Sequence, residues 1–220
     1  MKLIKTIKYK LTEETLEKDI DCFIADAKKG NYHMDKMYDN EGLKIIKQYL
    51  RILKEKFKNN ELEECKNCYH KLVPFLLIHS CAEEDLFDYN DLLAMLTKDF
   101  DLIVRNYFIC LVKTCDSEEL ADKISEYTYS LDYYGFDSDK DILLDNLNEL
   151  QLKNLETRML IKTEGMTKKD QGKQEIIYFL MDIAQIQEDK DKYISLCERF
   201  RGVFSEKEID ELKKEYGSNN

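Results

Sequence analysis

The sequence predicts an all-α protein of about ten helices in antiparallel pairs, arranged as an α-solenoid or an irregular helical bundle. Three observations support this fold class. The 220 residues include only one proline and seven glycines, whereas a β-rich domain needs turn residues about every 8–12 positions. Glu, Lys and Leu, which are good helix formers, dominate the composition. Apolar residues recur every three or four positions along most of the chain, as in amphipathic helices.

In the first half of the chain, the apolar stripes predict five helices. They are expected over residues 11–30, 41–58, 61–77, 92–96 and 100–111. Asn60 and Glu63 are predicted to form a capping box at the start of the third helix. The helix from Phe100 is apolar on nearly every side, a pattern that is typical of a central helix.

The second half predicts a further set of helices. They are expected over residues 117–131, 142–159, 175–187, 189–201 and 205–216, with a change of apolar phase near Leu150. Ser117 is expected to cap the first of them, and Ser205 with Glu208 to form a capping box at the last. We expect one helical domain over residues 1–220, with a hinge at residues 132–141 that divides it into two subdomains.

Three junctions along the chain share one pattern, a polar or acidic turn between two helices. They lie in the stretches KFKNNELEECKNCYHKL, LVKTCDSEELADKISEY and AQIQEDKDKYISLCERF. In this respect the chain resembles the helix-turn-helix units of α-solenoids such as tetratricopeptide and HEAT repeats, at the level of architecture. It lacks the Trp-Leu-Gly-Tyr series of tetratricopeptide repeats, and its junctions are unequally spaced. The resemblance implies a scaffold that binds another protein.

The charge balance argues against nucleic acid as a partner. The chain has 45 acidic and 34 basic residues, a net charge of −11, and therefore repels a phosphate backbone. No apolar run of about 18 residues predicts a membrane span, and the first ten residues lack the apolar core of a signal peptide. The seven cysteines show no regular framework, as is typical of reduced thiols. We therefore expect a cytoplasmic protein with no membrane contact.

Cys65 and Cys68 lie one helical turn apart and are followed by His70. A zinc site needs four ligands in tetrahedral geometry, and no second pair of ligands follows at a suitable spacing. Known catalytic motifs, including His-Glu-x-x-His, Gly-x-Ser-x-Gly and the phosphate-binding loop, do not occur in the sequence. We therefore expect buried or half-buried helix cysteines, no metal, no cofactor and no catalytic activity.

Asp137, Asp139 and Asp141 are spaced like the first half of a calcium-binding loop. An EF-hand also needs Gly at the sixth position and Glu at the twelfth, where this chain has Ile142 and Asn148. We expect these acids instead to cap and start a helix at Ile142, because the dipole at a helix N-terminus favours negative charge.

The same segment contains the candidate partner-binding site. Its residues are Tyr133, Tyr134, Phe136, Asp137 and Asp139. The two tyrosines follow a predicted helix end and are flanked by five aspartates. Aromatic side chains on loops are favoured contact residues, and acids attract a basic partner. The alternative interpretation is that the tyrosines seal a junction between helices in the core.

The preferred hypothesis is a helical-repeat interaction or scaffold protein that binds another, basic protein without catalysis. Two alternatives stay open: an acidic helical inhibitor or immunity-type regulator of a basic enzyme, and an enzyme of unrecognised type. The distribution of the acids, gathered on one concave face or spread evenly, separates the first two hypotheses. An enzyme would need polar groups that converge in one apolar pocket.

Overall fold

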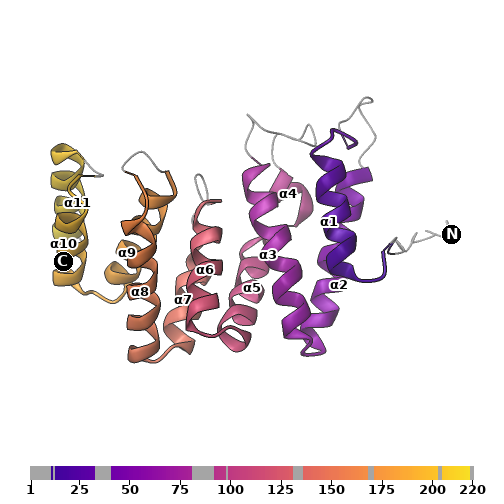
Figure 1. The fold of residues 1–220 in the computed structure, drawn as a ribbon, viewed down its shortest axis with the longest axis horizontal. Helices are drawn as coiled ribbons and strands as arrows, with labels where there is room; N and C mark the ends of the chain where they lie inside the picture. The colour runs from indigo at the N-terminus through magenta and orange to yellow at the C-terminus, as the bar shows by residue number, and fades with distance from the viewer. Residues whose placement is uncertain are drawn as a thin grey trace. The chain divides into compact units, whose positions relative to one another are not determined.

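The computed structural model describes residues 11, 13–32, 41–80, 92–97, 99–130, 136–167, 171–202 and 205–218. These residues form eleven α-helices and no strand, which confirms the all-α prediction (Figure 1). The first five helices are α1 (Leu16–Ala27), α2 (Glu41–Lys58), α3 (Leu62–Ile78), α4 (Leu92–Leu96) and α5 (Asp101–Thr114). The others are α6 (Ser117–Thr128), α7 (Asp137–Asn146), α8 (Glu149–Glu164), α9 (Gln171–Ile186), α10 (Lys190–Arg199) and α11 (Glu206–Ser218).

The chain divides into two compact units. Unit 1 comprises Met1–Thr114 and Tyr133–Asp139, and unit 2 comprises Cys115–Asp132 and Lys140–Asn220. Two of the three points at which the chain passes between the units lie within residues 132–141. A hinge motion at that segment stays a prediction.

Helix α3 is the central helix of unit 1. It packs against α1, α2, α4 and α5 (Figure 1). Because it has neighbours on several sides, nine of its 17 residues are buried, including Tyr69 and Leu72. We expected the helix from Phe100 to be the central one, but α5 leaves Leu102 42% exposed. A helix that is apolar on nearly every side can therefore pack beside the central helix and leave some of its apolar residues exposed.

Helix α9 has the corresponding role in unit 2. It packs against α6, α8 and α10, and α11 packs against α10 (Figure 1). Its apolar residues are buried on more than one side, because different neighbours cover different faces. They are Ile176, Ile177, Phe179, Leu180, Met181, Ile183 and Ala184.

The end of α2 differs from the sequence prediction. Asn60 takes a left-handed backbone conformation, with φ of 63°. The N–H of Asn60 donates to the Phe57 carbonyl at 3.0 Å, and the N–H of Glu61 donates to the Lys56 carbonyl at 3.1 Å. This pair of hydrogen bonds is the Schellman motif, which closes a helix. Asn60 therefore ends α2, and the predicted capping box between Asn60 and Glu63 is wrong.

The cap of α6 is also one residue from its predicted position. Asp116, and not Ser117, is the N-cap residue. Its side chain accepts hydrogen bonds from the backbone N–H groups of Glu118 and Glu119, both at 2.9 Å. A carboxylate is also favoured at this end of the helix by the dipole, since its negative charge faces the positive end.

The predicted capping box at α11 is confirmed, because Ser205 and Glu208 each accept a hydrogen bond from the other's backbone N–H. The single helix predicted over residues 142–159 is wrong, because α7 ends at Asn146 and α8 begins at Glu149. The change of apolar phase near Leu150 marks this break between two helices. There Asn148 caps α8 and forms a capping box with Gln151.

Candidate functional site

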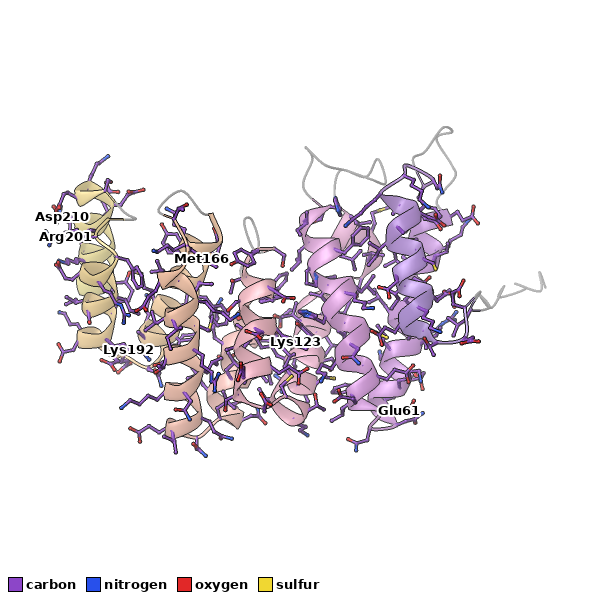
Figure 2. The ribbon with its side chains drawn as sticks, in the orientation of Figure 1. Glu61, Lys123, Met166, Lys192, Arg201 and Asp210 are labelled. Carbon is purple, nitrogen blue, oxygen red and sulfur yellow. The ribbon has the colours of Figure 1, made fainter. Side chains whose placement is uncertain are left out.

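The negative charge of the protein is concentrated in residues 115–150, which we call the acidic segment. It holds eleven acidic and two basic side chains, a net charge of −9 out of −11 for the whole chain. One of the two bases, Lys123, lies on α6 (Figure 2) and is 3.8 Å from Glu119. The acidic segment is therefore the part of the sequence that would attract a basic partner most strongly.

The residues predicted as the partner-binding site lie inside this segment. Tyr133 and Tyr134 fall outside the part of the chain that the structure describes. Phe136 is half-buried, and its ring centroid lies 5.8 Å from that of Phe100, a buried residue of unit 1. Phe136 therefore helps to attach the start of α7 to unit 1.

Helix α7 begins at Asp137, five residues before the predicted start at Ile142. Its first turn is held by Ser138, whose hydroxyl donates to the Asp101 carboxylate at 2.6 Å and to the Asp101 backbone carbonyl at 3.2 Å. Asp139 is 0% exposed. A contact residue has to reach the surface, so the structure does not place Asp139 where a partner could touch it. The prediction that these acids cap a helix at Ile142 is wrong.

Among the side chains of α7 that the structure describes, the exposed acids are Asp141 and Asp145. They are four residues apart and therefore lie one turn apart on the same side of the helix. Glu149, the first residue of α8, is exposed as well. None of these three carboxylates has a hydrogen-bond or ion-pair partner within the described ranges. We call them the unpaired acids.

The positions of Asp141 and Asp145 cost helix stability. Like charges four residues apart destabilise a helix by about 0.2–0.5 kcal/mol. Asp145 also lies in the last turn of α7, which contains no basic residue. The helix dipole makes a negative charge there unfavourable by about 0.3–1 kcal/mol. Residues that break local rules without compensation inside the chain are expected at functional sites.

The acids of α6 are in a different situation, because unit 2 supplies their partners. Glu118 lies 3.2 Å from Arg158 of α8, and Asp122 forms an ion pair with Lys162 of the same helix. Ion pairs inside unit 2 therefore neutralise part of the negative charge of the acidic segment. Asp141, Asp145 and Glu149 have no such partner in the described part of the chain.

A shallow cleft of about 470 Å³ lies in unit 1 at the turn between α2 and α3, where Figure 2 labels Glu61. It is lined by Asn60, Glu61, Leu62, Glu63, Glu64 and Thr114. Its carboxylates are already paired. Lys56 contacts Glu61 at 2.7 Å and Glu64 at 2.6 Å, and these hydrogen bonds hold the pKa of Lys56 above its usual range. Lys66 contacts Glu63 at 2.6 Å. With one apolar side chain in its lining, the cleft lacks the apolar walls of a typical small-molecule site.

The two cysteines of the zinc-like motif lie in the core of unit 1. Cys65 and Cys68 are both 0% exposed on α3, which confirms the expectation of buried helix cysteines. Within the described residues, no three or more His, Cys, Asp or Glu side chains are grouped so that they could hold a metal ion. The described helices also include none that combines the length and the apolarity of a bilayer span.

The charge count along the sequence locates the acidic segment, whereas the site predicted from the sequence, Tyr133, Tyr134, Phe136, Asp137 and Asp139, does not include Glu149. The likeness to tetratricopeptide and HEAT repeats stays a prediction at the level of architecture. Comparison of the chain with protein-family models, with curated proteins and with solved structures finds no match.

Proposed function

We propose that this protein is a non-catalytic helical scaffold that binds a basic segment of another protein through Asp141, Asp145 and Glu149. One observation supports the proposal above all. Asp141 and Asp145 are exposed, one turn apart on α7, and have no partner in the described part of the chain. Repulsion between the two carboxylates destabilises α7 in the free protein. A basic partner bound to both of them would replace this repulsion with attraction.

The spacing of the two aspartates suggests the form of the partner. Residues four apart on a helix are separated by about 6 Å along its axis. Basic residues at a similar spacing occur four apart on a helix, or two apart on an extended strand at about 6.6 Å. Arginine is favoured, because its guanidinium can donate two hydrogen bonds to one carboxylate.

Binding measurements with a partner captured from cell extract test the proposal. In the test variant, Asp141→Asn, Asp145→Asn and Glu149→Gln are combined. We expect its Kd to rise about tenfold or more, which corresponds to about 1.4 kcal/mol. The affinity of the wild type should fall with added salt, and that of the variant should fall less, because exposed charges are screened.

A matched control removes two exposed acids outside the acidic segment. Asp191 and Asp210 of unit 2 are exposed and form no ion pair within the described ranges. Asp191→Asn combined with Asp210→Asn should change the Kd less than about twofold, since the control leaves the acidic segment intact. Equal losses in both variants would mean that net charge alone drives binding. Unchanged binding in the test variant would contradict the proposal directly.

Tyr133 and Tyr134, which lie near these acids in the sequence, stay predicted contact residues for the partner. Replacing both with alanine should weaken the same interaction, because aromatic contacts supply much of the binding energy at interfaces. The circular dichroism spectrum should stay that of a folded helical protein. Loss of that spectrum would instead indicate the core-junction interpretation.

A further inference from the structure

Helix α8 carries an uncharged stripe on the side that faces away from its neighbours in unit 2. The stripe consists of Leu150, Asn154, Thr157 and Ile161, which are all exposed, and we call it the α8 stripe. Leu150 and Ile161 are 68% and 59% exposed, more than any other large apolar side chain in the described ranges. The buried side chains of α8 lie on its opposite side, which packs against α6 and α9 (Figure 1).

The spacing within the α8 stripe is that of helix-to-helix packing. Its four residues follow one another at intervals of four, three and four positions. Residues at these intervals stay on one face of a helix, and the same alternation forms the contact seam of a coiled coil. An asparagine in such a seam, here Asn154, restricts the register of the two helices. Since an exposed helix face is usually charged and polar, the α8 stripe has the pattern of a face that receives a second helix.

The charges around the α8 stripe limit which helix fits. Glu149 precedes the stripe directly, and Asp145 lies four residues before Glu149. Lys153 lies beside the stripe, is exposed and forms no ion pair within the described residues. On the other side, Arg158 is 3.2 Å from Glu118 of α6. Basic residues of a partner are therefore attracted to the Leu150 end of the stripe and repelled farther along it.

A second copy of this chain fits the α8 stripe poorly. Two α8 stripes placed face to face would bring Lys153 and Arg158 of both copies to the edges of one interface. Each copy would also add its acidic segment, with a net charge of −9. Like charges across an interface oppose association. Charge complementarity therefore favours a helix of a different protein.

We propose that the α8 stripe binds an amphipathic helix of the partner protein, with the apolar side of that helix on the stripe and its basic residues at the end next to Glu149. The inference rests on the proposed function, because Asp141, Asp145 and Glu149 orient the bound helix. It adds that the basic residues of the partner belong to a helix. It also adds that burial of Leu150 and Ile161 supplies part of the affinity.

Fluorescence anisotropy with synthetic helical peptides and the full-length protein tests the inference. The leucine peptide carries leucines at the intervals of the α8 stripe and arginines at one end, and it is made in both chain directions. The alanine peptide has alanine in place of each leucine. In one direction, the leucine peptide should bind the wild type with a Kd about tenfold or more below that of the alanine peptide. Leu150→Gln combined with Ile161→Gln, the stripe variant, should remove this difference, because glutamine keeps the helix propensity but not the apolar contact.

Leu102→Gln combined with Ile186→Gln is the matched control. It also replaces one exposed leucine and one exposed isoleucine, which lie on α5 and α9. The control variant should keep the difference between the leucine and alanine peptides, since it leaves the α8 stripe intact. A loss of the difference in the control variant as well would mean that the leucine peptide binds apolar surface at large, and would overturn the inference.

The remaining outcomes separate this inference from the proposed function. Equal binding of the two peptides to the wild type, or a difference that persists in the stripe variant, would overturn the inference alone, provided that Asp141→Asn, Asp145→Asn and Glu149→Gln together still weaken binding. Undiminished binding of both peptides to that triple variant would contradict the proposed function and the orientation inferred from it. A wild-type dimer in sedimentation that the stripe variant converts into a monomer would identify a second copy as the occupant, and would also overturn the inference.

Discussion

At the scale of single residues, Gly172 and Tyr129 are fitted to each other. The Tyr129 ring lies directly over Gly172 in the first turn of α9, so that a Cβ atom on Gly172 would stand 1.2 Å from Cε1 of the ring. The Tyr129 hydroxyl is also 3.7 Å from Met166 Sδ. Glycine is needed here for the close approach of the ring, because no side chain could share that space.

Replacing Gly172 tests this contact. Gly172→Ala should destabilise the wild type, because the ring or the helix has to move. In a Tyr129→Ala background, the same change should stabilise by about 0.5–1 kcal/mol, since alanine favours the helix over glycine. Urea unfolding of the four proteins should give a coupling energy of about 1–3 kcal/mol. A coupling near zero would show that the ring does not occupy this space in solution.

Glu188 shows the opposite case, a position that suits glycine but holds another residue. Its φ of 56° lies in the left-handed region, which costs a non-glycine residue about 1–2 kcal/mol. The backbone there closes α9 with two hydrogen bonds, from Glu188 N–H to the Gln185 carbonyl and from Asp189 N–H to the Ala184 carbonyl. This is a second Schellman ending, for which glycine is the usual residue.

Glu188→Gly should therefore stabilise the protein by about 0.5–1 kcal/mol, because the relief of backbone strain exceeds the added entropy of the unfolded chain. The neighbouring Gln187→Gly is the matched control, since Gln187 is exposed and has an ordinary backbone conformation. It should lower stability by a similar amount. Denaturant midpoints measure both changes. A gain in both variants, or in neither, would contradict the argument.

At the scale of elements, ion pairs connect α6, α8, α10 and α11 in one consistent direction. In five ion pairs between these helices, the acid belongs to the earlier helix and the base to the later one. The pairs are Glu118–Arg158, Asp122–Lys162, Glu156–Lys192, Glu164–Arg199 and Glu198–Lys213. Exposed pairs contribute little stability individually, about 0–1 kcal/mol. Their shared direction would disfavour a wrong order of helices, because like charges would then meet.

Asp145 of α7 does not belong to this scheme, and its removal tests what it costs. Asp145→Asn should raise the free energy of unfolding by about 0.5–1 kcal/mol, since it removes both the repulsion from Asp141 and the unfavourable dipole interaction. Asp141→Asn, the control, removes the repulsion but lies farther from the helix C-terminus, so its gain should be smaller. Urea unfolding at low salt measures both. In 1 M salt the gains should shrink, and a loss of stability in Asp145→Asn would contradict this account.

At the scale of the whole molecule, pairing of carboxylates makes stability depend on pH in both units. Hydrogen bonds from Lys213 and Arg201 hold the pKa of Glu198 below its ordinary value in unit 2. Hydrogen bonds from Lys56 and Asn59 do the same for the pKa of Glu61 in unit 1. A carboxyl with a lower pKa in the folded state adds stability above its unfolded pKa, and loses it as the pH falls through the folded pKa.

The variant Glu198→Gln should show this dependence clearly. Its Tm should lie below that of the wild type by a constant amount above about pH 5.5, where the unfolded glutamate is ionised. The two curves should approach each other as the pH falls through the lowered pKa of Glu198, and meet where the wild-type carboxyl is protonated as well. Glu149→Gln, which removes an acid without an ion pair in the described ranges, is the control, and its deficit should be smaller, because only the dipole interaction in the first turn of α8 is lost. A pH-independent deficit for Glu198→Gln would mean that packing, and not charge, is lost.

The sequence by itself determined the fold class and most helix positions, because these depend on local information. The spacing of apolar residues placed α2 at residues 41–58 and α4 at residues 92–96, as in the structure. The capping box of Ser205 and Glu208 could also be predicted, because both residues lie within one helical turn. The start of α7 was missed because Ser138 is held by Asp101, a residue of another helix.

Only the tertiary structure decided which side chains meet across helices. The sequence shows that residues 115–150 are acidic, but not that α8 neutralises Glu118 while Asp141 and Asp145 stay exposed. Likewise, Cys65 and Cys68 are neighbours in the sequence, whereas the Cys65 thiol donates to the carbonyl of Leu53 on α2. The reason is physical. Periodicity shows that a helix has a face to bury, but apolar burial is non-directional and does not name the neighbour that covers it.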